Sequence, residues 1–423
     1  MSDDGGRGQP GAVVVVGAGV VGMACALYLQ RAGLPVTVID RLPPGEACSY
    51  GNAGGIAVSH LAPVAMPGVL RRIPRWLVER DGPLALRWSH LPAMTPWLLR
   101  FARAATPRQL ERLADAQASL LARSYESWSP LLKDGRLEGL VRHLGGIAPY
   151  RSESELARDA PHWRLVRSRG FPVERVDADS LRQLEPALPA AYRLAMFEPE
   201  WRQVIDPHRL VVGMAEHFQR NGGTILREQV AEFELAPDGV RALRTNAGLR
   251  PAGSVVIAAG AWSHHLARRL GSSFPLESGR GYNVTLPDPG MELRHQLIMP
   301  DSQVAITPMA MGLRFAGTVE FSGVDSPPDW RRARSVLAIA RRLFPGIRVD
   351  GYSQWAGDRP MTPDTIGVIG RSPHHRNAFF AFGHGHVGLT LAAITGRLVA
   401  ELVTGRPTSV DVRPFRIDRF SAP

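Results

Sequence analysis

Three glycines and one aspartate near the start of the chain have a spacing that suits a particular chemistry. Gly17, Gly19 and Gly22 form a G-x-G-x-x-G motif, and Asp40 follows 23 residues after the first of them. The first glycine of such a motif permits a tight turn, the second lets a pyrophosphate approach the backbone, and the third lets a helix pack closely on its sheet. An acid at about this distance accepts hydrogen bonds from a ribose. The four residues therefore predict a dinucleotide site.

The segments around the motif read as a strand, a helix and a second strand. Val13–Val16 and Val36–Ile39 are β-branched runs, and an apolar segment lies between them. The uncharged stretch 11–30 is also about as long as a membrane span, but three glycines and an immediate strand argue against that. The polar, acidic residues 1–10 argue against a signal peptide. The order predicts a dinucleotide-binding βαβ unit.

The composition excludes several other classes of protein. The chain has 423 residues and a net charge of +11, yet Lys133 is its only lysine, so the positive charge is nearly all arginine. We attribute this to a GC-rich genome and expect no nucleic-acid partner. A lone lysine in a polar stretch does not support a pyridoxal Schiff base or a P-loop. The two cysteines, Cys25 and Cys48, supply no disulfide framework, which predicts a cytoplasmic location.

Further segments extend the same nucleotide-binding domain. A Gly-rich loop, 45–55, follows the second strand, and Asp206-Pro207 has the composition of a helix start. Strands are expected at Thr224–Val230, within Val255–Ser263, and at Ile366–Ile369 and Ala378–Phe382. A second Gly-rich turn then opens a helix that ends at Gly405, and its N-terminus is available to an anionic group.

A second domain is expected between pieces of the first. Residues 107–133 have helical periodicity, Gly279–Leu286 and Met309–Phe321 alternate like strands, and Asp329–Leu343 reads as a basic helix. We predict an α/β, Rossmann-like, discontinuous nucleotide-binding domain with an inserted α+β domain that contains an antiparallel sheet. The expected boundaries are 11–90, 201–275 and 350–423 for the first domain, and 91–200 and 276–349 for the second.

The stretch 66–105 is rich in arginine, tryptophan and proline. One interpretation is a peripheral membrane segment that docks on the inner face of the cytoplasmic membrane. The other is a pair of proline-broken helices that cover the core, with their arginines in solvent. Both interpretations stay open.

Several motifs together resemble a known family. They are the N-terminal glycine motif, SYGNAGG at 49–55, VVIAAGAWS at 255–263, GRGY at 279–282, GDRPMTPD at 357–364 and GHGHVGLT at 383–390. In this order they resemble the flavin-dependent D-amino-acid oxidase superfamily. Within it the chain is most similar to D-amino-acid dehydrogenases, particularly the glyphosate oxidoreductase-like branch. The resemblance spans nearly the whole chain.

The resemblance implies that the dinucleotide is FAD. Some relatives attach the flavin through a histidine in the loop after the second strand, where this chain has Asn52 and no histidine before His60, so we expect non-covalent binding. The positions assigned to FAD are Gly17, Gly19, Val20, Val21, Gly22, Asp40, Arg41, Ser49, Asn52, Ala53, Gly54, Gly55, Val230, Ala259, Gly260, Trp262, Gly385, Val387, Gly388, Leu389 and Thr390.

The resemblance also places an anion anchor at the reacting end. Arg359 matches the family's carboxylate-binding position, and a planar guanidinium holds a carboxylate by two hydrogen bonds. The helix that opens near Gly388 would present N–H groups to the flavin's pyrimidine side, where negative charge develops on reduction.

Four other residues are candidates for the catalytic site. His384 and His386 alone make an incomplete metal set, so no metal is expected, and we predict flavin-side packing or substrate contact for them. Arg280 and Tyr282, from the inserted sheet, either close the roof of the pocket or are ordinary strand residues.

The implied reaction is the oxidation of an amine beside a carboxylate. A hydride passes from Cα to flavin N5, and the imine hydrolyses to a 2-oxo acid. The expected substrate is a D-amino acid or an N-substituted glycine, with glyphosate-type C–N cleavage to glyoxylate as a side activity. Alternatives are a cyclic secondary amine such as D-proline or D-hydroxyproline, and a flavin subunit of a membrane electron-transfer complex.

The identity of the electron acceptor stays open between a quinone and O₂. Sarcosine-oxidase relatives use a lysine near the flavin to activate oxygen. Because Lys133 lies outside every flavin motif, we favour a dehydrogenase.

Overall fold

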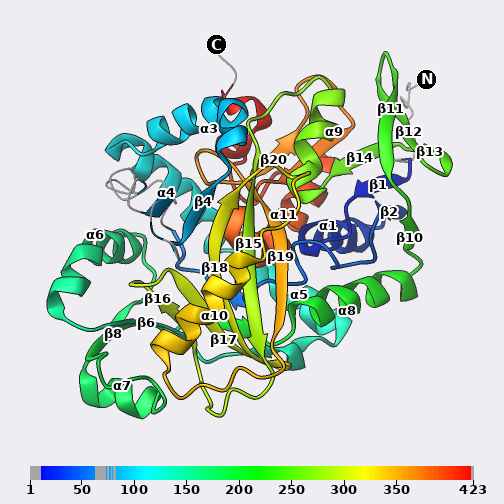
Figure 1. Cartoon of the computed structure of the whole chain (residues 1–423). Coiled ribbons are helices and arrows are strands. Elements are labelled where there is room, and N and C mark those ends of the chain that lie inside the picture. The colour runs from blue at the N-terminus through cyan, green and yellow to red at the C-terminus, as the bar shows by residue number, and fades with distance from the viewer. Residues whose placement is uncertain (1–10, 62–72, 74–75, 78, 80–81, 421–423) are drawn as a thin grey trace, which may run out of the picture.

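The N-terminal glycine motif follows strand β1 of a six-stranded sheet (Figure 1). The computed structural model describes residues 11–61, 73, 76, 77, 79 and 82–420. The strand order is β10 (Thr224–Arg227), β2 (Val36–Asp40), β1 (Val13–Val16), β14 (Ser254–Ile257), β21 (Ala378–Phe382) and β20 (Val368–Arg371). The strands run parallel except β20, which is antiparallel to β21.

Alternate side chains of β1 point to opposite faces of this sheet, and each face is covered by its own layer of elements. Val13 and Val15 join the core cluster that contains α1 and α11, whereas Val14 and Val16 join the cluster that contains α9 and β12. One face carries α1 (Val20–Arg31), α8 (Pro207–Arg220) and α11 (Gly388–Val403). The other carries α9 (Ser263–Arg269) and a small sheet of β11 (Val230–Ala236), β12 (Gly239–Thr245) and β13 (Gly248–Pro251).

A larger, mostly antiparallel sheet forms the second half of the molecule. Its order is β19 (Ser353–Met361), β15 (Glu277–Leu286), β18 (Gly312–Phe321), β17 (Val304–Met309), β16 (Gln296–Met299), β6 (Gly146–Tyr150), β8 (Leu194–Glu198) and β7 (Glu174–Val176). Strand β4 (Leu84–Leu86) also pairs with β18, in parallel. Helix α10 (Arg331–Leu343) covers one face of this sheet and buries its apolar side against β15 and β18 (Figure 1).

Shorter elements connect the two sheets. The remaining helices are α3 (Leu91–Ala104), α4 (Pro107–Leu121), α5 (Ser124–Gly135), α6 (Glu153–Ser168) and α7 (Ala178–Leu184). A small sheet joins β3 (Gly55–Ile56), β9 (Arg202–Val204) and β5 (Val141–Arg142). The 3₁₀ turns are η1 (Trp88–His90), η2 (Glu138–Leu140), η3 (Gly260–Trp262), η4 (Gly385–Val387), η5 (Arg413–Phe415) and η6 (Ile417–Phe420).

Most elements predicted for the nucleotide-binding domain are confirmed. The βαβ unit is β1–α1–β2, and the strand predicted from Thr224 joins β2 in parallel as β10. Asp206 caps α8 as predicted, because its Oδ1 accepts the Arg209 N–H at 2.9 Å and Pro207 is the first helical residue.

Three local expectations need correction. The strand predicted at Met309–Phe321 is β18, which begins at Gly312; Met309 is the last residue of β17, and the two strands meet in a hairpin at residues 310–311. The helical stretch 107–133 is two helices, α4 and α5. The strand predicted to begin at Ile366 begins at Val368 instead.

Strand β19 changes how the domain boundaries are drawn. The sequence places residues 350–423 with the FAD-binding segments, yet β19 pairs along its length with β15 of the large sheet. Likewise β4, expected within 11–90, pairs with β18. We therefore propose that the third FAD-binding segment begins after Met361.

Part of the 66–105 stretch lies outside the described residues. The rest of it that the structure describes forms β4, η1 and α3, and α3 contains Pro96 in its interior. Trp88 and Leu99 are exposed, to 70% and 58%, whereas Trp97 and Phe101 are buried.

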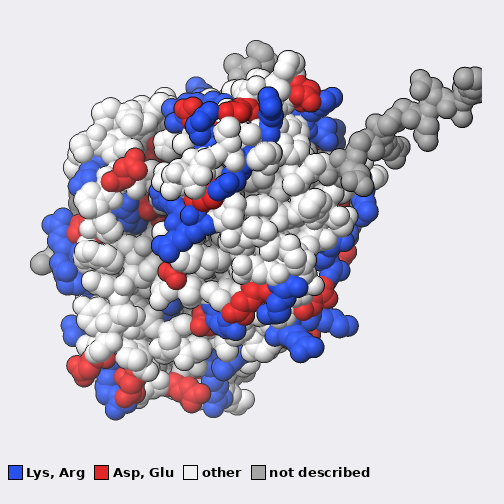
Figure 2. Space-filling model, turned by 90° about the vertical axis from the view of Figure 1, so that its right-hand side faces the viewer, with Lys and Arg blue, Asp and Glu red and all other residues white. Residues whose placement is uncertain are grey.

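Helix α11 is a core helix. With its preceding turn (Gly385–Val403) it is long and apolar enough to cross a membrane, but 67% of it is buried inside the protein. It packs along α1, where a Cβ on Gly396 would lie 2.5 Å from the Ala24 carbonyl oxygen. Figure 2 shows the face to the right of Figure 1, on which side chains of both charges are interspersed among the described residues. The positive charge is not gathered into one patch on that face.

Candidate active site

The turn between β1 and α1 has the geometry that a pyrophosphate cradle requires. Gly17 has φ +117°, and a Cβ there would lie 2.3 Å from the Ala258 carbonyl oxygen. A Cβ on Gly22 would lie 1.9 Å from the Gly17 carbonyl oxygen, so helix and turn approach as closely as the motif predicts. Gly19 caps α1 without a side chain, and the Val20 N–H donates to Ser49 Oγ at 3.0 Å. Ser49 thus joins the positive end of the helix, where phosphate oxygens bind.

The predicted adenosine side gathers at the carboxyl ends of neighbouring strands. The Asp40 carboxylate accepts the Ala18 N–H at 2.7 Å and the Leu42 N–H at 2.9 Å, which fixes it at the end of β2. The Arg41 guanidinium lies 4.2 Å from the ring centre of Trp262, which follows β14. Ligands of open α/β sheets bind at this edge. The residues present therefore fit the ADP half of FAD.

The loop 48–55 is held by polar side chains of the large sheet. Asn283 Nδ2 donates to the Gly51 carbonyl at 2.8 Å, Arg314 Nη1 to the Asn52 carbonyl at 2.8 Å, and Thr307 Oγ1 to the Ala53 carbonyl at 2.9 Å. Three successive carbonyls of the loop are thereby tied down toward the sheet. The loop is fixed where the resemblance predicts the flavin.

These three anchoring residues were missed in the sequence. A weak signal exists, since each is a polar residue on a strand at a position that alternates with apolar ones. That pattern shows which face they share but not that a loop 230 residues earlier covers it.

The N-terminus of α11 lies beside the same loop. Val387 caps it without a side-chain hydrogen bond, whereas Thr390 Oγ1 accepts the Ala57 N–H at 3.0 Å. Trp128 Nε1 donates to the Leu389 carbonyl at 3.1 Å. Leu389 and Thr390 therefore fix the start of the helix, where the first-turn N–H groups have no partner within the helix and the positive end of its dipole lies.

A cavity of about 730 Å³ lies between these parts. Its walls come from the large sheet, from helix α3, from the loop that contains residues 48–55 and from the start of α11. Among the sequence-predicted residues it is lined by Asn52, Ala53, Gly55, Arg359, Gly385, His386, Val387 and Thr390. The structure thus brings the predicted flavin loop, the α11 helix start and the predicted carboxylate anchor into one cavity.

Arg359 enters this cavity from β19 without a carboxylate of its own. Its guanidinium lies over Gly281, where a Cβ would be 2.1 Å from Cζ. Nη1 donates to the Thr318 carbonyl at 3.3 Å. Within the described part of the chain, no Asp or Glu forms an ion pair with it. Burial lowers its pKa from the ordinary value, and the half-buried, unpaired guanidinium would gain from an external anion.

A β-bulge provides the contact to Arg359. The register of β15 and β18 shifts between Gly281 and Tyr282, which leaves Thr318 as the extra residue. Thr318 has φ +57°, a conformation that costs energy for a residue other than glycine. Bulges of this kind redirect the groups beside an active site.

The two candidate histidines differ in their surroundings. His386 has an exposed side chain that lines the cavity, and desolvation by its surroundings, Arg359 and His60 lower its pKa below the ordinary value. His384 is buried, and its Nε2 is 2.9 Å from Thr395 Oγ1. Its pKa is lowered to about 4 by burial. Both are neutral at pH 7, and only His386 lines the large cavity.

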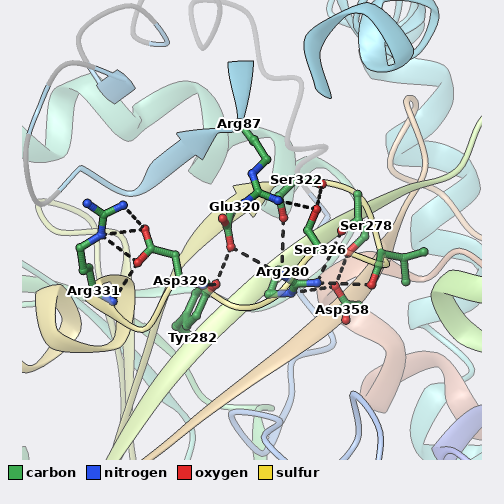
Figure 3. Close-up of polar contacts among 12 residues, drawn as sticks. Arg87, Ser278, Arg280, Tyr282, Glu320, Ser322, Ser326, Asp329, Arg331 and Asp358 are labelled. Carbon is green, nitrogen blue, oxygen red and sulfur yellow. Dashed lines mark hydrogen bonds and ion pairs between the residues drawn. The ribbon is translucent and has the colours of Figure 1, made fainter. Parts of the chain in front are cut away.

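Arg280 and Tyr282 are not among the residues that line the cavity, so their predicted place in the pocket roof is corrected. Alternate residues of a strand point to opposite faces, and these two point away from Arg359. Arg280 Nε donates to Asp358 at 3.0 Å and Nη1 lies 3.8 Å from Glu320, while the Tyr282 hydroxyl donates to Glu320 (Figure 3). They form a buried polar network on the back of the sheet.

Comparison with known proteins identifies the family. The family described as "FAD dependent oxidoreductase" (DAO) matches residues 12–402. A D-amino-acid oxidase of Bradyrhizobium diazoefficiens is 34% identical over 415 residues, which cover 96% of this chain and 98% of that one. A D-amino acid dehydrogenase of Paramagnetospirillum magneticum is 35% identical over 428 residues, 97% of this chain and 99% of that one.

Solved structures show the same fold. Glycine oxidase from Geobacillus kaustophilus superposes with a TM-score of 0.76 at 23% identity, over 97% of this chain and 99% of that one. L-Proline dehydrogenase from P. horikoshii has a TM-score of 0.74 at 20% identity, over 97% and 98%. The resemblance, the fold class and the FAD cofactor predicted from the sequence are confirmed. This chain belongs to the DAO family of FAD dependent oxidoreductases.

Proposed function

We propose that this flavoenzyme oxidises the Cα of a D-amino acid or an N-substituted glycine to give a 2-oxo acid. The observation that carries the proposal is Arg359, a half-buried guanidinium without a described carboxylate partner, in the cavity that the flavin loop and the α11 helix start also line. The full-length similarity to a D-amino-acid oxidase and a D-amino acid dehydrogenase supports the same class of substrate.

Each group in the cavity has a part in this chemistry. Bound FAD would accept the hydride of the Cα–H bond, and the imine product would add water to give the 2-oxo acid and ammonia, or an amine for an N-substituted glycine. Arg359 would hold the substrate carboxylate by two hydrogen bonds. The N–H groups before α11 would stabilise negative charge on the pyrimidine side. His386 is kept neutral by its surroundings, so it adds no positive charge beside the substrate amine.

We propose a dehydrogenase that passes its electrons to a quinone. Lys133 lies on α5 and does not line the cavity, so the lysine that activates oxygen in sarcosine-oxidase relatives has no counterpart among the described lining residues. Aerobic and anaerobic turnover with a soluble quinone analogue would separate the two acceptors. Equal rates of hydrogen peroxide and quinol formation would contradict the proposal.

An anaerobic flavin-reduction panel tests the function. Purified holoenzyme is mixed with D-amino acids, N-substituted glycines including glyphosate, D-proline and D-hydroxyproline, and bleaching of the flavin absorbance is followed. Reduction by acyclic D-amino acids supports the proposal. Reduction by cyclic amines alone would favour the cyclic-amine alternative, and no reduction by any amine would favour a flavin subunit of a larger complex.

Two smaller proposals accompany this function. We propose non-covalent FAD, because residue 52 is asparagine; acid precipitation should leave a colourless pellet, and a yellow pellet would contradict this.

We also propose a cytoplasmic enzyme that contacts the membrane through 66–105, since Trp88 and Leu99 are exposed there. Co-sedimentation with liposomes should increase with anionic lipid, and a constant bound fraction would remove the membrane contact.

A further inference from the structure

The side of the cavity formed by α3 and β4 is built from large apolar side chains. Met94, Trp97 and Phe101 follow one another at helical spacing on one face of α3, so all three point to the same side. With Leu84 and Leu86 of β4 and Phe321 of β18 they line the cavity. We call these six residues the apolar wall.

Aromatic contacts fix the apolar wall in place. The ring of Trp97 stacks on Phe101 with 5.2 Å between centroids and lies 5.5 Å from Phe321. Trp97 Nε1 donates to the Met361 carbonyl at 3.1 Å, so the N–H of the indole is already satisfied by the protein. The surface that remains is apolar and preformed.

The same hydrogen bond ties the apolar wall to the anion anchor. Met361 is two residues after Arg359 on β19, so both residues point to one face of the strand. A ligand carboxylate on Arg359 and an apolar group against Trp97 would therefore lie in one cavity, at a fixed distance and orientation relative to each other.

The cavity offers little to a charged side chain. Among the described residues that line it, Arg359 is the one with a permanent charge, and the histidines His60 and His386 both have lowered pKa values. A second carboxylate or an ammonium group on the substrate would find no oppositely charged partner among the described lining residues besides Arg359, only neutral polar ones such as Gln296 and Gln303, so it would lose hydration without an ion pair.

We infer that the enzyme selects amino acids with a large apolar side chain, branched aliphatic or aromatic, which packs against the apolar wall while Arg359 holds the carboxylate. This inference rests on the proposed function and adds the side-chain class to it. Each methylene buried there should improve binding roughly fourfold.

A substrate series on the wild-type holoenzyme tests this inference. The apparent dissociation constants of D-alanine, D-leucine, D-phenylalanine and D-glutamate are obtained from anaerobic flavin reduction. D-Leucine and D-phenylalanine should bind at least tenfold more tightly than D-alanine, and D-glutamate should be the poorest. If D-alanine or D-glutamate binds as well as D-phenylalanine, the inference is wrong while the proposed function stands. If no amino acid in the series reduces the flavin, the proposed function fails first and the inference fails with it.

A matched pair of variants locates the preference. Leu86 is partly accessible from the cavity, so Leu86→Trp should narrow the space beside the apolar wall and lower the ratio of D-phenylalanine to D-alanine affinity at least tenfold. Leu99→Trp places the same ring on the exposed face of α3, outside the cavity, and should leave that ratio unchanged. Equal ratios in the two variants would show that the side chain binds elsewhere.

Discussion

Two arginines on neighbouring strands of the large sheet have opposite surroundings. Arg280 on β15 points to the back of the sheet, is 3% exposed, and contacts the carboxylates of Asp358 and Glu320 (Figure 3). Arg359 on β19, next to Asp358 in sequence, points into the cavity and has the Thr318 carbonyl as its protein partner. One guanidinium is neutralised by the fold, and the other is left for an external anion.

This difference separates structural charge from functional charge. A buried cation is costly unless it is paired, and a buried network with all its partners present mainly fixes the geometry around it. The fold retains the unpaired Arg359 at a cost in stability, which is characteristic of a binding site. The paired network in turn holds β19 against β15, so it positions Arg359 from behind.

The largest expected effect is a loss of stability when Arg280 is removed from its buried carboxylate partners. Arg280→Met leaves the carboxylates of Asp358 and Glu320 buried without their cation, which should lower the free energy of unfolding by about 3–5 kcal/mol. Urea denaturation of the holoenzyme measures this loss. Arg331→Met, on an arginine that is 80% exposed beside Asp329, is the control and should change stability little. Equal losses in the two variants would contradict the structural role of Arg280.

Removing Arg359 should instead lower substrate affinity and leave stability intact. Arg359→Leu removes a half-buried cation that has no described carboxylate partner, so the free energy of unfolding should not fall, and FAD should be retained. Apparent affinity for carboxylate substrates should fall by about 2–3 kcal/mol, roughly 30- to 150-fold, because a charge-assisted pair is lost. Anaerobic flavin titration gives both the FAD content and the affinity. Unchanged affinity would move the carboxylate anchor to another residue.

A buried carboxylate near the cavity extends the comparison to negative charge. Glu198 is 4% exposed and receives hydrogen bonds from neutral groups, and burial raises its pKa to about 7. Because the folded state then binds a proton that the unfolded state releases near pH 4.5, stability should fall as the pH rises from about 4.5 to about 7. Glu198→Gln should remove this slope and stabilise the protein at pH 8 by on the order of 3 kcal/mol. Thermal unfolding of both proteins at pH 5 and pH 8 measures the difference, and parallel pH profiles would show that Glu198 is ionised in the fold.

The sequence predicted what local patterns determine. The glycine motif, Asp40 and the strand runs fixed the βαβ unit, because each of those roles depends on residues within about 30 positions. Arg359 and His386, singled out from two separate motifs, line one cavity although they come from different elements; their predicted roles stay predictions.

The face of the sheet on which a side chain lies and the residues that it contacts were harder to predict, because both depend on pairing between strands far apart in the sequence. Arg280 and Tyr282 lie on the opposite face of the sheet from Arg359, and that follows from the register of β15 with β19, which pairs Arg280 with Asp358 and Gly279 with Arg359. The pairing of β19 with β15 joins residues about 80 positions apart. The contacts of Asn283 and Arg314 with loop 48–55 span more than 200 positions. No local pattern in one sequence carries that information.

The smallest expected effect tests the position of Arg359 rather than its charge. A Cβ at residue 281 would lie 2.1 Å from Cζ of Arg359, so Gly281→Ala must displace the guanidinium. The end of a long side chain can move at little cost, and we expect near wild-type stability with a loss in substrate affinity of about 1 kcal/mol, roughly fivefold.

A double-mutant cycle shows whether that loss acts through the guanidinium. In the Arg359→Leu background, Gly281→Ala should cost no further affinity, because the group that it displaces is absent. The coupling energy would then equal the whole effect of the single Gly281→Ala variant. Additive losses would mean that residue 281 influences the substrate directly, and that the cavity face of β15 binds the carboxylate together with β19. Full coupling thus indicates a site in which the Arg359 guanidinium alone contacts the anion. Additive losses indicate a site in which the backbones of β15 and β19 also contribute.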